Sequence, residues 1–283
     1  LRLRVGIRIS NVSPNKSAEI LNDVISKPSI YPVLNSGEVI ELTWPGSAPY
    51  NEPWFTYLTG NGPWYATCAT MIDALKNLND PRLPVYAQPV PDSDPVDYAG
   101  LRVGSPSSDF SLSNVSKIGT AYGYTANGTS PMLRYSEVCF IKAEAFKRNL
   151  TTGGNAEQEY IKGVTASLSE NGINDASTYL AQPTVAWDNT SADLNKLYLQ
   201  KWISLFKASN EAWSESRRTD VPFMNKVPLQ YNSSHNRPPV RYPYPDEESS
   251  LNEENIAPHL VGLDNTDLFW GKLMWWDTRT GVQ

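Results

Sequence analysis

Apolar residues recur every three or four positions over several stretches of the chain, which is the period of an amphipathic helix. These stretches cover about residues 14–26, 63–78, 133–149, 156–170, 192–206 and 210–218. Some have clear ends: Ser13-Pro14 is an N-cap followed by a first-turn proline, and Asn171-Gly172 stops the fourth stretch. The pattern predicts a mainly α fold of helical hairpins. The most apolar helix, about Leu133–Asn149, should lie at its centre.

Long stretches without any periodicity separate these helices, at residues 28–62, 84–131 and after Pro222. They are rich in proline, glycine, serine, asparagine and aromatic residues. Connections this long in a compact domain are usually functional or packed surface loops. We therefore expect long irregular aromatic-rich loops on a helical body. Three tryptophans on helical stripes are predicted to lie in the core: Trp64, Trp202 and Trp213.

Composition narrows the possible functions. Of the 283 residues, 40% are hydrophobic and 19% are charged, which is enough to form a real core. The net charge is −6 and the basic residues do not cluster, so nucleic acid is not an expected partner. No stretch approaches the roughly 20 apolar residues that a membrane-spanning helix requires.

The potential metal ligands are few. Cys68 and Cys139 both lie in helical apolar patterns, and we interpret them as buried free thiols. Together with His235 and His259 they show no zinc-ligand spacing, so we expect no metal and no cofactor.

No familiar catalytic motif occurs, but paired carboxylates leave one enzymatic alternative open. A glycoside hydrolase needs only one carboxyl group on each side of the scissile bond. Glu41 and Glu52 lie among aromatic residues and are the candidates for an α-helical enzyme of this kind. The acidic runs at residues 246–248 and 253–254 could hold calcium. We favour helix starts for them, because carboxylates interact favourably with the N-terminal end of a helix.

Aromatic residues are unusually dense between Tyr31 and Tyr57. Six fall in this segment, about twice the density of the whole chain, in which 11% of residues are aromatic. Flat, rigid side chains with polar edges suit the apolar faces of sugar rings. The candidate ligand-binding residues are Trp44, Tyr50, Trp54, Tyr57 and Tyr124. The alternative is that these side chains anchor the loops onto the helical body.

Several motifs resemble, in order and over nearly the whole chain, those of the SusD/RagB family. The matching segments are LRLRVGIRISNV (1–12), NDPRLP (79–84), MLRYSEVCFIKAEA (132–145), QKWISLF (200–206), EAWSESRRTDVP (211–222) and RYPYPDEESSLN (241–252). The most similar branch is the starch-binding, outer-membrane-associated one. Glu137 and Glu144 lie on a mostly apolar helix within these motifs, so we expect each to pair with Arg or Lys. Arg217 and Arg218 end a helix, where cations meet the C-terminal dipole.

The resemblance implies a function as well as a fold. Such proteins carry tetratricopeptide-like helix pairs and are lipid-anchored on the outer face of the outer membrane. They capture oligosaccharides, or in some members peptides, and deliver them to a SusC-like TonB-dependent transporter without catalysis. We interpret residues 1–283 as a single SusD-like domain that lacks the family's N-terminal part and its lipidated cysteine. An exported setting would also make a disulfide between Cys68 and Cys139 chemically possible.

Overall fold

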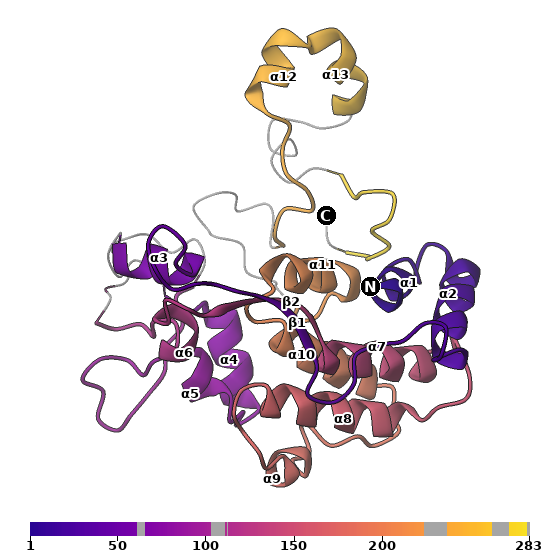
Figure 1. The fold of residues 1–283 in the computed structure, drawn as a ribbon. Coiled ribbons are helices and arrows are strands. Elements are labelled where there is room, and N and C mark those ends of the chain that lie inside the picture. The colour runs from indigo at the N-terminus through magenta and orange to yellow at the C-terminus, as the bar shows by residue number, and fades with distance from the viewer. Residues whose placement is uncertain (61–65, 103–110, 112, 224–236, 262–271, 282–283) are drawn as a thin grey trace.

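The computed structural model describes residues 1–60, 66–102, 111, 113–223, 237–261 and 272–281. Helices dominate these residues, which also include one small sheet (Figure 1). The helices are α1 (Arg2–Arg8), α2 (Pro14–Ser26), α3 (Pro53–Gly60), α4 (Ala69–Asn77), α5 (Leu83–Tyr86), α6 (Thr120–Gly123), α7 (Tyr135–Lys147), α8 (Ala156–Ser169), α9 (Ser177–Leu180), α10 (Asp193–Ser204), α11 (Ser209–Thr219), α12 (Asp246–Leu251) and α13 (Glu253–Leu260). The predicted mainly α class, with helical hairpins and long loops, is confirmed.

The centre of the core is the hairpin of α7 and α8, against which α10 packs (Figure 1). Phe140 on α7 and Tyr160 on α8 are fully buried, with ring centroids 6.4 Å apart. The two helices approach closely at Gly163, where an added Cβ would lie 2.8 Å from the Phe140 ring. The prediction that this apolar helix is central is therefore confirmed.

The hairpin of α1 and α2 packs on the other side of α7. Leu3 and Ile7 from α1 and Leu21 from α2 form a second buried cluster with Ile141 of α7. One helix thus contributes to two apolar clusters, which explains why α7 is apolar on more than one face.

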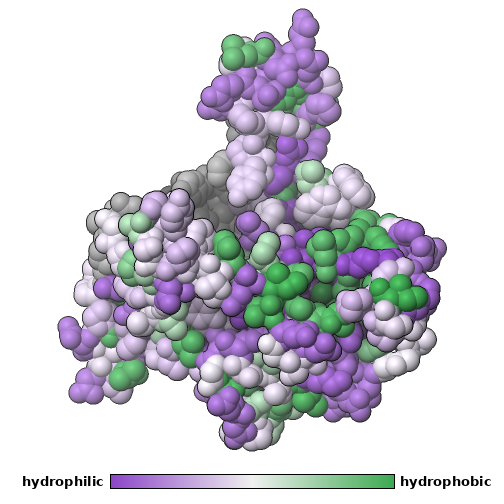
Figure 2. Space-filling model, in the orientation of Figure 1, coloured by the Kyte–Doolittle hydropathy of each residue, from purple (hydrophilic) through white to green (hydrophobic). Residues whose placement is uncertain are grey.

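Residues predicted to be irregular form a two-stranded sheet instead. Strand β1 (Val39–Thr43) pairs antiparallel with β2 (Thr129–Arg134), and the register shifts between Ile40 and Glu41. Exposed hydrophobic side chains gather near the middle of the face shown in Figure 2. On the strands themselves, Leu42 of β1 and Met132 of β2 are exposed. The sheet therefore lies on the surface of the helical body rather than in its core.

Two further predictions need correction. Residues 53–60, expected to lack helical structure, form α3. Trp213, expected in the core, is 48% exposed, whereas Trp202 is buried as predicted. The reason is that α11 turns a polar side inward, with Glu215 and Arg218 buried, and Trp213 lies on the opposite side. Trp64 and the predicted start of its helix lie outside the described residues, which show α4 from Ala69.

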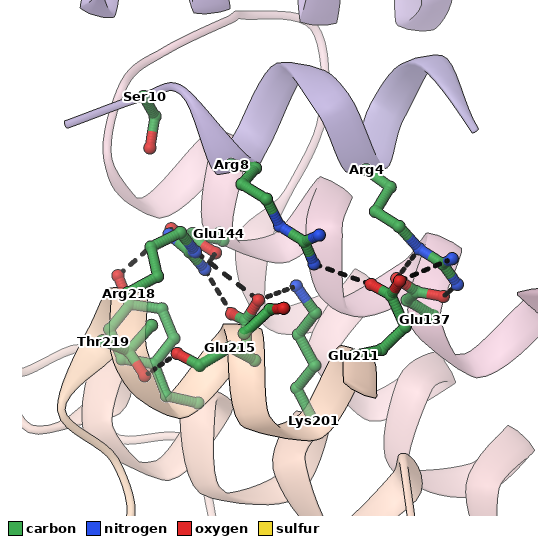
Figure 3. Close-up of polar contacts among 12 residues, drawn as sticks. Arg4, Arg8, Ser10, Glu137, Glu144, Lys201, Glu211, Glu215, Arg218 and Thr219 are labelled. Carbon is green, nitrogen blue, oxygen red and sulfur yellow. Dashed lines mark hydrogen bonds and ion pairs between the residues drawn. The ribbon is translucent and has the colours of Figure 1, made fainter. Parts of the chain in front are cut away.

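That inward side of α11 belongs to a buried network of ion pairs (Figure 3). Arg218 donates to both carboxylate oxygens of Glu144 on α7, at 2.7 Å each, and also pairs with Glu215. Lys201 of α10 lies 3.0 Å from Glu215, and all four side chains are at most 5% exposed. The network links three helices, and Arg218 is held by carboxylates more than by the helix dipole.

Two arginines of α1 form further ion pairs beside this network (Figure 3). Arg4 donates to Glu137 on α7, with its Nε 2.7 Å and its Nη2 2.5 Å from the carboxylate oxygens. Arg8 donates to Glu211 on α11 at 2.7 Å. The expectation that Glu137 and Glu144 pair with basic residues is confirmed.

We expect Glu144→Ala to lower the free energy of unfolding by about 3–5 kcal/mol, because removing one partner leaves Arg218 short of compensation in a buried site. The exposed pair Lys16–Glu19 provides the control, since Glu19→Ala should cost less than about 1 kcal/mol. Urea unfolding of the three chains measures both values. If both variants lost the same free energy of unfolding, the buried network would not stabilise the fold more than an exposed ion pair does.

A second prediction concerns pH. Burial alone would raise the pKa of Glu215, but Arg218 and Lys201 outweigh it and lower that pKa from 4.5 to about 2. Because the folded-state pKa is the lower one, this stabilisation is complete above about pH 4.5 and is lost as the pH falls toward 2. The shift corresponds to about 3 kcal/mol. Urea unfolding across this range should show the decline, and Glu215→Gln should flatten it.

Candidate functional site

Two loops that are far apart in the sequence lie against each other next to the sheet. The loop between β1 and α3 is hydrogen-bonded to the loop between α6 and β2: the Trp44 N–H donates to the Gly128 carbonyl at 3.1 Å. The Glu52 N–H likewise donates to the Ala126 carbonyl at 2.9 Å. Gly46 has φ +77°, and a Cβ there would lie 2.7 Å from the Asn127 side chain. The close approach of the loops therefore requires glycine at this position.

The five aromatic residues predicted to bind ligand lie in these two loops or on α3, which follows the first of them. We use the term aromatic loop surface for Trp44, Tyr50, Trp54, Tyr57 and Tyr124. Tyr50 is 63% and Tyr57 54% exposed, while the other three are half-buried. Trp44 is fixed in orientation because its Nε1 donates to Ser130 Oγ at 2.9 Å.

Trp54 faces the helical body. Its ring meets Phe206 edge-on with centroids 5.8 Å apart, and the Lys207 ammonium lies 5.4 Å from its centroid. Both partners come from the turn between α10 and α11. Trp54 therefore anchors α3 onto the helical body, which is the alternative role expected of these aromatic residues from the sequence.

Glu52, a candidate carboxylate of the hydrolase alternative, has a structural role. It is 1% exposed, and its Oε1 lies 3.0 Å from the ammonium of Lys207. Its other oxygen accepts the Phe55 N–H at 2.9 Å, in the first turn of α3. A carboxylate that is buried, paired and capping a helix does not present an oxygen to a substrate. Glu41 is half-buried on β1 and lines a pocket beside the sheet.

That pocket, which we call the polar pocket, has a volume of about 510 Å³. Its polar lining comes from several elements of the fold and includes Glu41, Tyr122, Arg134, Glu170, Asn171 and Lys207. Four of these side chains hold each other in place. Tyr122 donates to Asn171 Oδ1 at 2.7 Å, and Arg134 lies 3.4 Å from Glu170. Burial raises the pKa of Tyr122, so its hydroxyl stays protonated and remains a donor.

Comparison with known proteins decides the family. Residues 1–245 match the SusD-like family described as "Starch-binding associating with outer membrane". This chain belongs to the SusD-like family. No curated protein matches it.

Solved structures of SusD homologues share the fold. A SusD-like protein from Bacteroides thetaiotaomicron has a TM-score of 0.79 at 24% identity, over 100% of this chain and 63% of its own. A chitin-binding SusD homologue from Flavobacterium johnsoniae has a TM-score of 0.76 at 24% identity, over 98% and 62%. A homologue from Bacteroides vulgatus has a TM-score of 0.77 at 27% identity, over 98% and 61%. The chain therefore spans about three fifths of the length of these proteins.

Other candidate chemistry in this SusD-like chain is limited. The described ranges contain no group of three or more His, Cys, Asp or Glu residues placed to hold a metal ion. The acidic residues at 246–248 and 253–254 occupy the first turns of α12 and α13, as expected. Cys68 and Cys139 are free thiols, and burial raises the pKa of both, that of Cys139 to about 11. None of the helices described is long and apolar enough to cross a membrane.

The structural role of Glu52 can be separated from a catalytic one. We expect Glu52→Gln to lower the free energy of unfolding by about 3 kcal/mol, because it leaves the buried ammonium of Lys207 unpaired. Glu41→Gln, the control, should change it by less than about 1 kcal/mol. Urea unfolding and a glycan-cleavage assay on the same samples measure both properties. Loss of product formation in Glu52→Gln without loss of stability would support the hydrolase instead.

Proposed function

We propose that this chain is part of a lipid-anchored protein on the outer face of the outer membrane that captures oligosaccharides. It delivers them to a SusC-like TonB-dependent transporter and catalyses no reaction on them. The family description names starch binding and association with the outer membrane. One structural relative is described as chitin-binding. Both support a glycan as the ligand.

The observation that carries this proposal is the pairing of exposed aromatic rings with a polar pocket. Sugar rings offer apolar C–H faces and a rim of hydroxyl groups, so a glycan site needs flat apolar side chains and a few fixed polar groups. The flat apolar side chains are the exposed rings of Tyr50 and Tyr57 and the oriented indole of Trp44. The fixed polar groups are those of the polar pocket.

Lys207 connects the two parts of this site. It lines the polar pocket, lies beside the Trp54 ring and pairs with Glu52. Its charge and those of Arg134 and Glu170 are compensated within the protein. The carboxylates of Glu38 and Glu41 also line the pocket, and neither forms an ion pair with another described residue. They disfavour an anionic ligand, which supports a neutral glycan such as starch or chitin.

Aromatic truncations test the proposal. Trp44→Ala and Tyr50→Ala should each weaken oligosaccharide binding by about 1–3 kcal/mol if they are binding anchors. Trp54→Ala should instead lower the stability, because Trp54 packs on Phe206. Calorimetric titration with a panel of starch and chitin oligosaccharides, with a product assay on the same samples, gives affinity and turnover together.

The matched control is Val96→Ala, since Val96 is 69% exposed and lies outside the aromatic loop surface. It should bind as the unaltered chain does. Unchanged affinity in Trp44→Ala and Tyr50→Ala, with folding intact, would remove this assignment. Binding of peptides in place of all glycans would assign the chain to the peptide-capturing members of the family.

A further inference from the structure

A second group of aromatic residues is exposed far from the aromatic loop surface in the sequence. Trp275 is 81%, Tyr242 82% and Trp213 48% exposed. The rings of Trp213 and Tyr242 lie beside each other, with centroids 6.3 Å apart and an angle of 31° between their planes. Clustered exposed aromatic residues are typical of binding sites rather than of ordinary protein surface.

Trp213 and Trp275 border a cavity of about 300 Å³ between α1, α11 and the segment 272–281, which we call the tryptophan pocket. Three indoles line it, those of Trp213, Trp275 and Trp276, and Ile9 and Val12 add aliphatic surface. None of the described residues lines both this cavity and the polar pocket. The tryptophan pocket is therefore separate from the site assigned above.

Neutral polar side chains interrupt the apolar lining. Asn11, Ser214 and Thr278 contribute to the wall of the pocket. Apolar surface from flat rings, with a few neutral hydrogen-bonding groups between them, is the composition expected of a site for a ligand with both apolar faces and hydroxyl groups.

The charged groups of the wall are paired within the protein. Arg217 is 6% exposed and donates to Asp277 at 2.9 Å. Arg8 donates to Glu211 at 2.7 Å, and Arg218 is held by Glu144. A charged ligand would have to compete with these pairs, so the pocket favours a neutral one.

Buried donors in this wall remain without a hydrogen-bond partner in the described part of the chain. Arg217 lies between two indoles, 5.0 Å from the Trp213 centroid and 5.4 Å from that of Trp276. Its Nε and Nη1, and the Nε of Arg8, are buried without a hydrogen-bond partner among the described residues. Buried donors of this kind are costly unless an acceptor satisfies them. The hydroxyl and ring oxygens of a sugar are neutral acceptors, whereas a peptide would also bring N–H donors that need acceptors of their own.

We propose that the tryptophan pocket is a second saccharide-binding site, which takes a pyranose unit of a neutral glycan against its indoles. Its volume lies at the lower end of the roughly 300–1,000 Å³ of ligand pockets, which fits a single sugar unit or two rather than a long chain. The buried guanidinium of Arg217 supplies donors for the sugar oxygens once an indole moves aside. Binding should therefore change the tryptophan fluorescence.

The test uses the full chain and two neutral probes, maltohexaose and chitohexaose, titrated by calorimetry and by fluorescence. In the variant Trp44→Ala/Tyr50→Ala, which disables the aromatic loop surface, one binding event should remain for at least one probe. Adding Trp275→Ala should weaken that event at least tenfold and remove its fluorescence change. Because Trp275 is highly exposed, this substitution should leave the circular dichroism and the urea midpoint unchanged.

Leu251→Ala is the matched control, because Leu251 is 84% exposed on α12 and should not alter binding. Unchanged residual affinity in the Trp275→Ala chain would overturn the second site, and so would the absence of any residual binding event. A Trp275-dependent event with an acidic oligosaccharide or a peptide only would overturn the neutral glycan as its ligand. The proposed function fails separately, if Trp44→Ala/Tyr50→Ala has the affinity and stoichiometry of the unaltered chain.

Discussion

The fold depends on the buried ion pairs that join α7, α10 and α11. Glu144 and Glu215 would each be strongly destabilising in this interior if they were alone, and Arg218 with Lys201 compensates both. Charged groups in the core must meet in a specific geometry, so the network determines how α11 is rotated about its axis. Neighbouring ion pairs of Arg4 with Glu137 and of Arg8 with Glu211 hold α1 against α7 and α11.

The rotation of α11 has a consequence on the opposite side of the helix. With Glu215 and Arg218 facing inward, Trp213 must face outward, next to the segment that carries Trp275 and Trp276. The same constraint that stabilises the scaffold thus exposes the indoles of the tryptophan pocket. A similar arrangement occurs at α3. The buried ion pair of Glu52 and Lys207 fixes the start of this helix, and Tyr57 lies on its exposed side.

The sequence predicts those features that depend on neighbouring residues. The helices α2, α7, α8 and α10 follow from apolar periodicity and from their end signals, and the paired state of Glu137 and Glu144 follows from their apolar surroundings. The strands β1 and β2 could not be predicted in this way, because 85 residues separate Thr43 from Thr129 and their pairing is not encoded locally. The prediction that Trp213 lies in the core is wrong, because its helical stripe gives no sign that a polar side of the helix is buried. The sequence also gives no sign of the polar pocket, because its residues come from segments that are far apart in the chain.

The charge compensation that builds the scaffold also limits what either pocket can bind. The cations of both walls, including Lys207 and Arg217, are already paired with carboxylates of the chain. An anionic ligand would have to displace these pairs, and in the polar pocket it would also meet the carboxylates of Glu38 and Glu41. What remains for recognition is aromatic surface and hydrogen-bonding groups, which suits neutral sugars. Selectivity among such sugars must then depend on the shape of the aromatic surfaces, because a neutral sugar carries no charge by which an ion could distinguish it.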